Sequence, residues 1–264
     1  MPTVSVLMTA YNREDLIAEA IESVLSSVYE DFELIIVDDC SKDRTVEIAQ
    51  RYAAKDKRIS VYINEQNLGD YNNRNRAASY ATGKYIKYSD SDDIMYPHCL
   101  QVMVTAMEKY PESGFALCAK EDHHHTYPML VSGKEAYREH FEGFGHFDRA
   151  PGSAIIRKDV FDKVGGFSGE RMIGDSDLWF RIAMYYPLVK IVTGLYWARL
   201  HESQESQTAY AQKQYVALRN MIIERYFAHN DCPLSQSEKN KYRQQVKKRN
   251  RLVLVKQFAI KLVR

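Results

Sequence analysis

The sequence lacks the features that define several large classes of protein. Its 264 residues include only four cysteines, widely separated and without a C-x-x-C pair. We therefore expect reduced thiols, as in a cytosolic protein, and neither a disulfide framework nor a zinc site. It has no G-x-G-x-x-G or Walker A motif, which argues against dinucleotide-binding and P-loop enzymes. No apolar run approaches the ~20 residues needed to cross a bilayer.

A charge bias is also missing. The chain has 36 Lys and Arg against 35 Asp and Glu, so its bulk electrostatics predicts no nucleic acid or other polyanionic partner. Its N-terminus enters a β-prone run at once, without the cationic and apolar regions of a signal peptide. We therefore expect a cytoplasmic protein, peripheral to the membrane at most. A chain of this length can bury a large core, as one domain or as a domain with an appendage.

What the chain does contain is a regular alternation of strand and helix patterns. Strands are expected at 4–9, 32–37, 59–64, 85–89 and 153–157, and helices at about 13–26, 45–54 and 73–81, from about 175, and from 207 with a break near 233. Ser41 is in position to cap the second helix. The order of these elements predicts an α/β fold in which a central, mostly parallel sheet is flanked by helices on both faces.

Polar segments follow three of the expected strands. Residues 9–12, 38–39 and 90–93 each lie just beyond the C-terminal end of a strand. In parallel sheets these ends share one edge, and ligands bind beyond it. The three segments are far apart in the sequence but should meet at one rim, so the pattern predicts a binding site there.

The third segment, Asp-Ser-Asp-Asp at 90–93, places three carboxylates within four residues. Carboxylates this close raise one another's pKa unless a cation neutralises them. Hard oxygen ligands suit Mg²⁺ or Mn²⁺, and these ions usually accompany a phosphate-bearing substrate. The alternative interpretation is a solvated acidic turn that caps the helix beginning near Pro97.

Taken together and in order, these segments resemble the inverting family 2 glycosyltransferases with the GT-A fold. The similarity extends over about residues 3–206, at 4–12, 37–41 (V-D-D-C-S), 67–75 (N-x-G with N-R-N), 81–93 (A-T-G-K-Y-I with D-S-D-D), 174–181 (G-D-S-D-L-W-F-R) and 199–206 (R-x-H with S). Two positions depart from the family pattern. Asn73 replaces the usual alanine, and Gly174 stands where glutamate is common.

The resemblance implies a domain organisation. It predicts a GT-A domain over 1–206, in which 1–113 binds the nucleotide-sugar and 114–206 the acceptor, followed by a helical extension over 207–264. The implied reaction transfers a sugar from a nucleotide diphosphate, UDP by default, to a hydroxyl of a glycan or lipid-linked acceptor. Inversion by single displacement and a role in cell-surface polysaccharide synthesis are part of the same expectation.

The resemblance also implies roles for individual residues. Asp175 is the expected general base, although an acid at a helix N-terminus can also serve the dipole. Asp92 is the expected ligand of Mn²⁺ or Mg²⁺, and His201 a further metal or diphosphate contact or else an ordinary histidine. The expected donor-binding residues are Thr9, Ala10, Tyr11, Asp39, Arg74, Asp90, Ser91 and Asp92. Tyr11 is also compatible with simple packing, and Arg74 with a helix-surface salt bridge.

The C-terminal segment has a strongly basic composition. After Glu238 there is no acidic residue, and ten Lys and Arg are interleaved with apolar residues. Such a helix over 239–264 can lie on the anionic inner leaflet of a membrane, or it can pack on the catalytic domain or a second subunit.

Two other functions remain open at this stage. A catalytically degenerate, glycan-binding or scaffolding member of the same fold would keep the sheet and lose the chemistry. A sugar nucleotidyltransferase is less expected, because the turn after the first strand contains no glycine. A haloacid-dehalogenase-type phosphatase normally carries its D-x-D motif on the first strand, whereas here three β-α units precede it.

Overall fold

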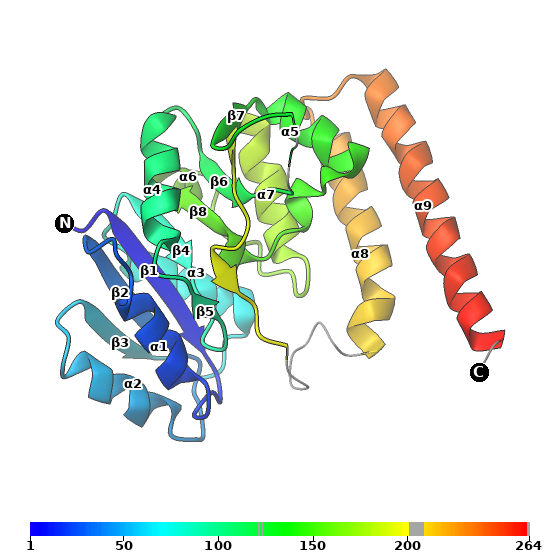
Figure 1. Ribbon diagram of the computed structural model, residues 1–264. Helices are drawn as coiled ribbons and strands as arrows, with labels where there is room; N and C mark the ends of the chain where they lie inside the picture. Colours follow the sequence, from blue (N-terminus) through cyan, green and yellow to red (C-terminus); the bar gives the residue numbers. More distant parts are fainter. Residues whose placement is uncertain (121, 123, 201–208, 263–264) are drawn as a thin grey trace.

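A computed structural model of the chain describes residues 1–120, 122, 124–200 and 209–262. A twisted sheet lies between two layers of helices, and two long helices stand at one side (Figure 1). The strands are β1 Val4–Ala10, β2 Phe32–Asp38, β3 Ile59–Ile63, β4 Tyr85–Tyr88, β5 Ile94–Met95, β6 Phe115–Cys118, β7 Met129–Val131, β8 Ala154–Arg157, β9 Leu188–Ile191 and β10 Tyr196–Trp197. The helices are α1 Ile17–Leu25, α2 Thr45–Ala53, α3 Asp70–Tyr80, α4 Cys99–Lys109, α5 Gly133–Glu139, α6 Lys158–Lys163, α7 Gly174–Tyr185, α8 Ala209–Ala228 and α9 Gln236–Leu262.

The main sheet has the strand order β3-β2-β1-β4-β8-β6-β9-β7. The first four strands are parallel, β8 is antiparallel to both of its neighbours, β6 and β9 are parallel, and β7 is antiparallel to β9. β5 and β10 form a separate antiparallel pair. The predicted mostly parallel α/β sheet is confirmed, with the ends of β1, β2 and β4 on one edge.

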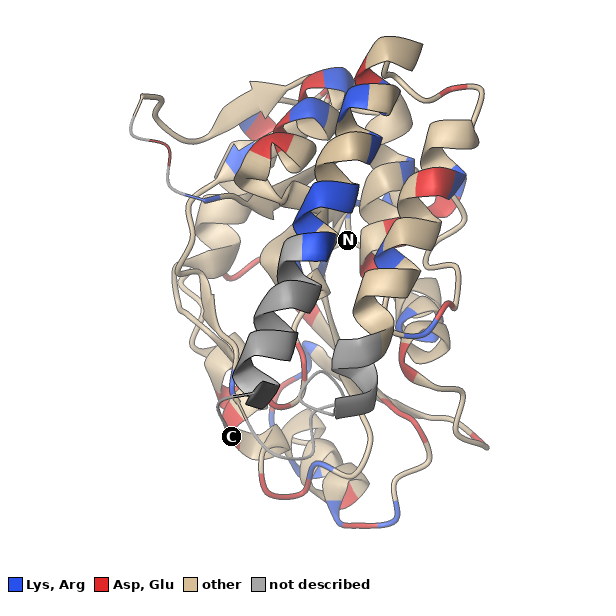
Figure 2. Cartoon of the chain, turned by 90° about the vertical axis from the view of Figure 1, so that its right-hand side faces the viewer, with Lys and Arg blue, Asp and Glu red and all other residues tan. Residues whose placement is uncertain are grey.

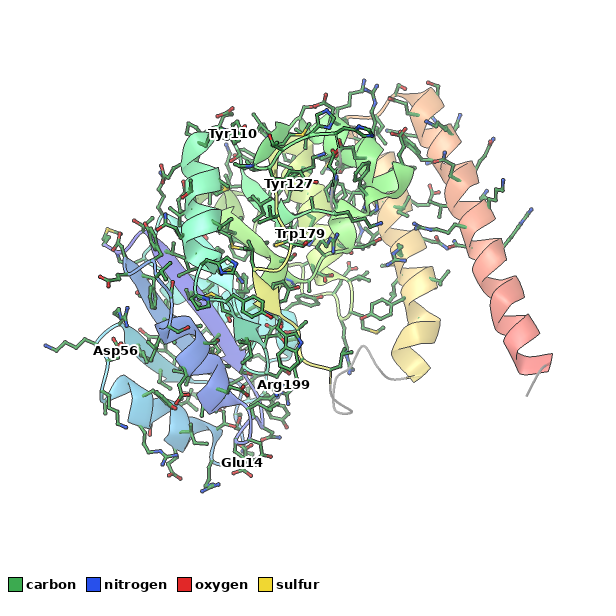
Figure 3. All side chains as sticks on the ribbon, in the orientation of Figure 1. Glu14, Asp56, Tyr110, Tyr127, Trp179 and Arg199 are labelled. Carbon is green, nitrogen blue, oxygen red and sulfur yellow. The ribbon has the colours of Figure 1, made fainter. Side chains whose placement is uncertain are left out.

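The alternation of side chains along β1 divides the core into two layers. Val4, Val6 and Met8 belong to the cluster that includes residues of α1, α2 and α4, whereas Leu7 belongs to the cluster on the other face, which includes residues of α3, α6, α7 and α8. All four side chains are fully buried, as is Trp179, which lies between the sheet and α7 (Figure 3). This arrangement confirms the expected helices on both faces. It holds the N-terminus of α7 close to the sheet.

Three local predictions need correction. The first helix begins at Ile17 and not near Arg13, because the N–H of Arg13 donates to Thr45 Oγ1 and this holds the preceding turn against the 43–45 loop. Ser41 does not cap α2, whose first residue is Thr45. The hydroxyl of Ser41 donates instead to the carboxylate of Asp38.

The third correction concerns α3, which begins at Asp70, three residues earlier than expected. Gly69 adopts a φ of +81°, a conformation that glycine accepts without strain, and this turns the chain directly into the helix.

The predicted C-terminal helices are present as α8 and α9, separated near Pro233 (Figure 1). Tyr226 of α8 stacks on Phe180 of α7, and Tyr242 of α9 stacks on Phe141. Tyr242 and Val246 are buried, so the first part of α9 packs on the rest of the chain. Within the described residues, no helix is both long and apolar enough to cross a membrane.

Candidate active site

The three polar segments meet at one edge of the sheet, as the sequence predicts. Ala10, the last residue of β1, is paired with Asp38 at the end of β2, and the carbonyl oxygen of Ala10 accepts the N–H of Asp39 at 2.8 Å. On the other side of β1, Leu7 is paired with Tyr88, and the N–H of Ser89 donates to its carbonyl. Thr9 and Ala10 therefore lie between the Asp38–Asp39 turn and segment 90–93.

Tyr11 and Ser91 occupy different environments at this edge. Tyr11 is 46% exposed, so its ring is not packed in the core and remains accessible for stacking. Ser91 is buried between the aspartates of its segment. The next residue after Tyr11, Asn12, has a φ of 51°. Its backbone N–H donates to Ser41 Oγ at 2.8 Å, which fixes the two turns to each other.

Asp39 holds in place the segment 64–69, which is far from it in the sequence. Its carboxylate accepts the side-chain amide of Asn64 at 2.9 Å and the backbone N–H groups of Leu68 at 2.8 Å and Gly69 at 2.9 Å. A carboxylate has about four acceptor positions, so three are occupied and one remains for a ligand. The amide of Asn73 joins the same network through Asn64 and also donates to the carbonyl of Val37, which explains why an amide replaces alanine here.

Arg74 is buried at the centre of the site. Its guanidinium donates to Asp70 at 2.8 Å and to Asp90 at 2.7 Å. Burial disfavours the charged form, but the two carboxylates outweigh it and raise the pKa of Arg74. In return, although burial opposes the effect, Arg74 lowers the pKa of Asp90. The alternative of a salt bridge along the helix is also present, as the pair with the half-exposed Asp70, although the guanidinium itself is buried.

The carboxylate of Asp92 is paired with Arg13, whose Nε lies 3.1 Å from Asp92 Oδ2. Arg199 lies on the segment that follows β10, on the side of the molecule where β1 and β2 end (Figure 3). Its Nε donates to the carbonyl of Asp92, and its backbone N–H donates to Asp93. Burial, with repulsion from Asp90, raises the pKa of Asp93 to about 7. Arg13 and Arg199, which are far apart in the sequence, thus both contact the acidic segment.

Asp175 begins α7, as the sequence predicts, and is partly buried. Burial raises its pKa to about 6, against the lowering influence of the Ser176 N–H, which donates to Asp175 Oδ1 at 2.7 Å, and of Arg74. A carboxylate with a pKa near neutrality can accept a proton from a hydroxyl group and release it again. The charge of Arg74 lowers the pKa of both Asp175 and Asp90, so the expected base and the acidic segment lie within the influence of the same guanidinium.

Asp177 is only two residues further along α7 but has a different environment. It is 2% exposed, and it accepts Arg181 at 2.6 Å, Arg225 at 3.1 Å and the hydroxyl of Tyr226 at 2.7 Å. All of these partners are protein groups, and two come from α8. Asp177 therefore joins α8 to the sheet domain, whereas Asp175 is the acid of α7 that faces the site.

The donor set of the acidic segment fits a divalent cation. Asp90 and Asp92 offer hard carboxylate oxygens at a strand end, and both now carry an arginine that supplies the compensating charge. Mg²⁺ and Mn²⁺ commonly take one or two protein carboxylates and complete their coordination with substrate phosphates and water. In the described part of the chain, no three His, Cys, Asp or Glu side chains converge on one point. His201 lies outside the described residues.

Sequence reasoning missed three residues of this site: Arg13, Tyr71 and Arg199. Tyr71 lies on the first turn of α3 and packs against the N-terminus of α7. Arg199 stands in a segment that the resemblance includes, and Arg13 directly follows another; their positive charges beside three aspartates were the available signal. A separate cavity of about 670 Å³, lined by residues of α6, α7 and α8 that include Arg181 and Tyr185, contains none of the predicted site residues.

Comparison with known proteins agrees with this geometry. A family model described as glycosyl transferase family 2 matches residues 5–165. An uncharacterised glycosyltransferase of Methanocaldococcus jannaschii is 43% identical over 197 residues, covering 68% of this chain and 64% of that protein. The Bacillus subtilis teichuronic acid biosynthesis glycosyltransferase TuaG is 45% identical over 124 residues, and EpsE of the same organism is 44% identical over 110 residues. These matches span 49% of TuaG and 40% of EpsE, less than half of either.

Solved structures show the same fold. S. aureus TarS in complex with UDP-GlcNAc superposes with a TM-score of 0.70 at 20% identity, covering 91% of this chain and 70% of that one. A mannosyltransferase of Pyrobaculum calidifontis in complex with GDP-Man and Mn²⁺ gives a TM-score of 0.62 at 20% identity, covering 85% and 61%. The sheet, the matching family model and the carboxylates at its edge lead to one conclusion: the chain belongs to glycosyl transferase family 2 and has the GT-A fold.

Proposed function

We propose that the protein is an inverting glycosyltransferase that moves a sugar from a nucleotide diphosphate to a hydroxyl of a glycan or lipid-linked acceptor. The observation that carries the proposal is the position of Asp175. Burial raises the pKa of Asp175 to about 6, and the charge of Arg74, which is paired with Asp90, also acts on Asp175, so a base and a diphosphate site would lie near one guanidinium. This is the arrangement that single displacement requires, with the acceptor hydroxyl deprotonated on the side away from the leaving group.

The donor side is assigned to the rim of the sheet. The ring of Tyr11 is exposed and available to stack on a base, and Asp39 keeps one acceptor position for the base or ribose. Asp90 and Ser91 continue this wall on the other side of Thr9 and Ala10. A UDP-sugar is the favoured donor by family resemblance, and it is supported by the likeness to TarS bound to UDP-GlcNAc. The GDP-Man complex of the mannosyltransferase makes GDP the second candidate.

A divalent cation would be held by Asp92, and His201 stays a candidate second ligand. Such an ion, when bound, stabilises the negative charge that grows on the leaving diphosphate. Arg13 and Arg74 now hold the carboxylates of Asp92 and Asp90. With a cation bound, both arginines would be free to contact phosphate oxygens of the donor, and we expect this role for them.

We assign the acceptor to the region 114–206 and keep 207–264 as a helical extension. A role in cell-surface polysaccharide synthesis is supported by the relative TuaG, which carries teichuronic acid biosynthesis in its name. A cytoplasmic enzyme at the inner face of the membrane would meet a lipid-linked acceptor. Exposed cations on the middle turns of α9 suit this location (Figure 2).

The degenerate, glycan-binding alternative would need the chemistry to be lost. Every carboxylate that the reaction requires among the described residues is intact, and the pKa of Asp175 is raised in a way that a purely structural acid does not need. This observation favours an active enzyme.

The test is nucleoside diphosphate release from a panel of UDP-, dTDP- and GDP-sugars, with Mn²⁺ and with bacterial lipid-linked saccharides as acceptors. We expect one donor to give acceptor-dependent release, and Asp175→Asn to reduce it by about 10²–10⁴-fold because the base is removed. Asp177→Asn, corrected for any unfolded fraction, serves as the matched control and should retain most of the activity. Full activity of Asp175→Asn would refute the mechanism.

A further inference from the structure

Gly174, one of the two departures from the family pattern, lies against the aromatic ring of Tyr71. A Cβ atom built on Gly174 would come within 2.8–2.9 Å of three ring carbons of Tyr71. Carbon atoms that are not bonded do not approach this closely, so any side chain at position 174 would require the ring to move. The glycine is therefore the residue that admits Tyr71 to the N-terminus of α7.

The Tyr71 ring is buried and packed on its neighbours. It is 7% exposed and packs on Phe167 with ring centroids 5.1 Å apart. Phe167 is itself fixed to α3, because Asn75 accepts its N–H at 2.9 Å and donates to its carbonyl at 2.8 Å. The ring is thus enclosed by α3, the turn at Phe167 and the backbone of Gly174. We call this enclosure the Tyr71 seat.

The seat brings Tyr71 to Asp175. Hydrogen bonding by the Tyr71 side chain lowers the pKa of the Asp175 carboxyl, while burial, followed by the negative charge of Asp175, raises the pKa of the phenol well above its usual value. The other groups that act on Asp175 are Arg74, which lowers its pKa, and Asp70, which raises it. From its own helix, Asp175 receives the N–H of Ser176. The backbone N–H of Asp175 in turn donates to the Tyr71 oxygen and lowers the pKa of the phenol, so Tyr71 interacts with both the backbone and the side chain of residue 175.

We propose that Tyr71 is the positioning residue of Asp175, that its O–H holds the carboxylate in the orientation needed to accept the proton of the acceptor hydroxyl, and that Gly174 is present because the ring occupies the space of a side chain there. The functional part of this proposal rests on Asp175 being the base. A family member with glutamate at this position cannot hold a tyrosine ring in the same seat. The placement of Tyr71 therefore depends on the glycine that this chain has at position 174.

The proposal is tested on the free protein by ¹³C NMR of the aspartate carboxyl groups, with the Asp175 signal assigned by its loss in Asp175→Asn. Tyr71→Phe keeps the ring and removes the hydrogen bond. We expect the Asp175 titration midpoint to move from about pH 6 to a higher pH, by roughly 0.5–1 pH unit for the loss of one hydrogen bond. Tyr80→Phe removes a hydroxyl from the end of the same helix, stacked on Tyr62, and should leave the midpoint unchanged. An unchanged midpoint in Tyr71→Phe would overturn the proposal.

A double-mutant cycle tests the role of the glycine. Gly174→Ala should lower the melting temperature by several degrees in the wild-type background, since its Cβ meets the ring, and by little in a Tyr71→Ala background, where the space is free. Equal losses in the two backgrounds would overturn the claim that the ring requires glycine. Neither measurement uses donor or acceptor. An Asp175→Asn variant that kept transfer activity would refute the base assignment of the proposed function, whatever these two experiments showed.

Discussion

Replacing Asp175 by asparagine should make the protein more stable at neutral pH while removing its activity. The carboxyl has a pKa of about 6 in the folded chain, against a value of 3.8 without burial. One pKa unit corresponds to 1.36 kcal/mol, so the ionised group costs up to about 3 kcal/mol of folding free energy. Because water reaches the partly exposed side chain, we expect about 2 kcal/mol.

The sign of this effect depends on pH. A carboxyl whose pKa is raised in the folded state is favoured by folding in its protonated form. Its cost is therefore absent below the unfolded pKa, grows between about pH 4 and pH 6, and is complete above that range. Asparagine has no charge to desolvate, so the advantage of Asp175→Asn over the wild type should appear across the same range.

The assay is thermal unfolding of both proteins at pH 4 and pH 8. For a chain of this size 1 kcal/mol changes the melting temperature by about 2–4 °C, which predicts a gain of about 4–8 °C at pH 8 and little at pH 4. The matched control is Asp177→Asn on the same helix. It breaks a buried ion pair with Arg181 and Arg225, so it should lose about 3 kcal/mol, the low end of the usual range because the arginines are partly exposed. A melting temperature of Asp175→Asn at or below the wild type at pH 8 would refute the reasoning.

Three further predictions follow from the same structure. Arg74→Lys should weaken nucleotide binding and destabilise the fold by about 2–3 kcal/mol in urea unfolding, because a lysine cannot bridge Asp70 and Asp90. Unchanged stability would contradict the importance of this buried double ion pair. The kcat/KM of the wild type should fall about tenfold per pH unit below pH 6, and a flat profile down to pH 5 would argue against Asp175 as base. Lys247→Glu/Lys248→Glu/Arg249→Glu, at three exposed positions of α9, should abolish sedimentation with anionic vesicles. The control Lys55→Glu, exposed and next to Asp56 on the side of the molecule away from α9 (Figure 3), should not, and equal sedimentation of all variants would remove α9 as the membrane contact.

Much of the fold could be predicted from the sequence because local patterns and long-range packing agree in the first 90 residues. The run Val4–Ala10 is mostly apolar and is buried along nearly its whole length, as expected of a central parallel strand, and the structure places it between two other strands. The ends of helices were harder to predict. Ser41 is of a residue type that commonly caps helices, but its hydroxyl donates to the carboxylate of Asp38 instead. Only the folded turn shows this.

The middle of the chain was predicted less completely for a related reason. β6, β7 and β9 are strands of three or four residues, too short for a periodic pattern to identify. At the site, the carboxylates were found from their position at strand ends. Tyr71 was not, because a tyrosine on a polar helix gives no sign that a glycine a hundred residues later leaves room for its ring.

The most direct test of the central claim is nucleotide binding measured by thermal shift, with UDP, GDP, dTDP, CMP and ADP, each with and without Mn²⁺. A ligand that binds only the folded state raises the melting temperature in proportion to RT ln(1 + [L]/Kd). We predict that one nucleoside diphosphate, UDP first, raises it only when Mn²⁺ is present, and that Asp92→Ala abolishes the rise. No shift with any nucleotide at millimolar concentration, or an equal shift in Asp92→Ala, would contradict a metal-assisted donor site at this edge of the sheet.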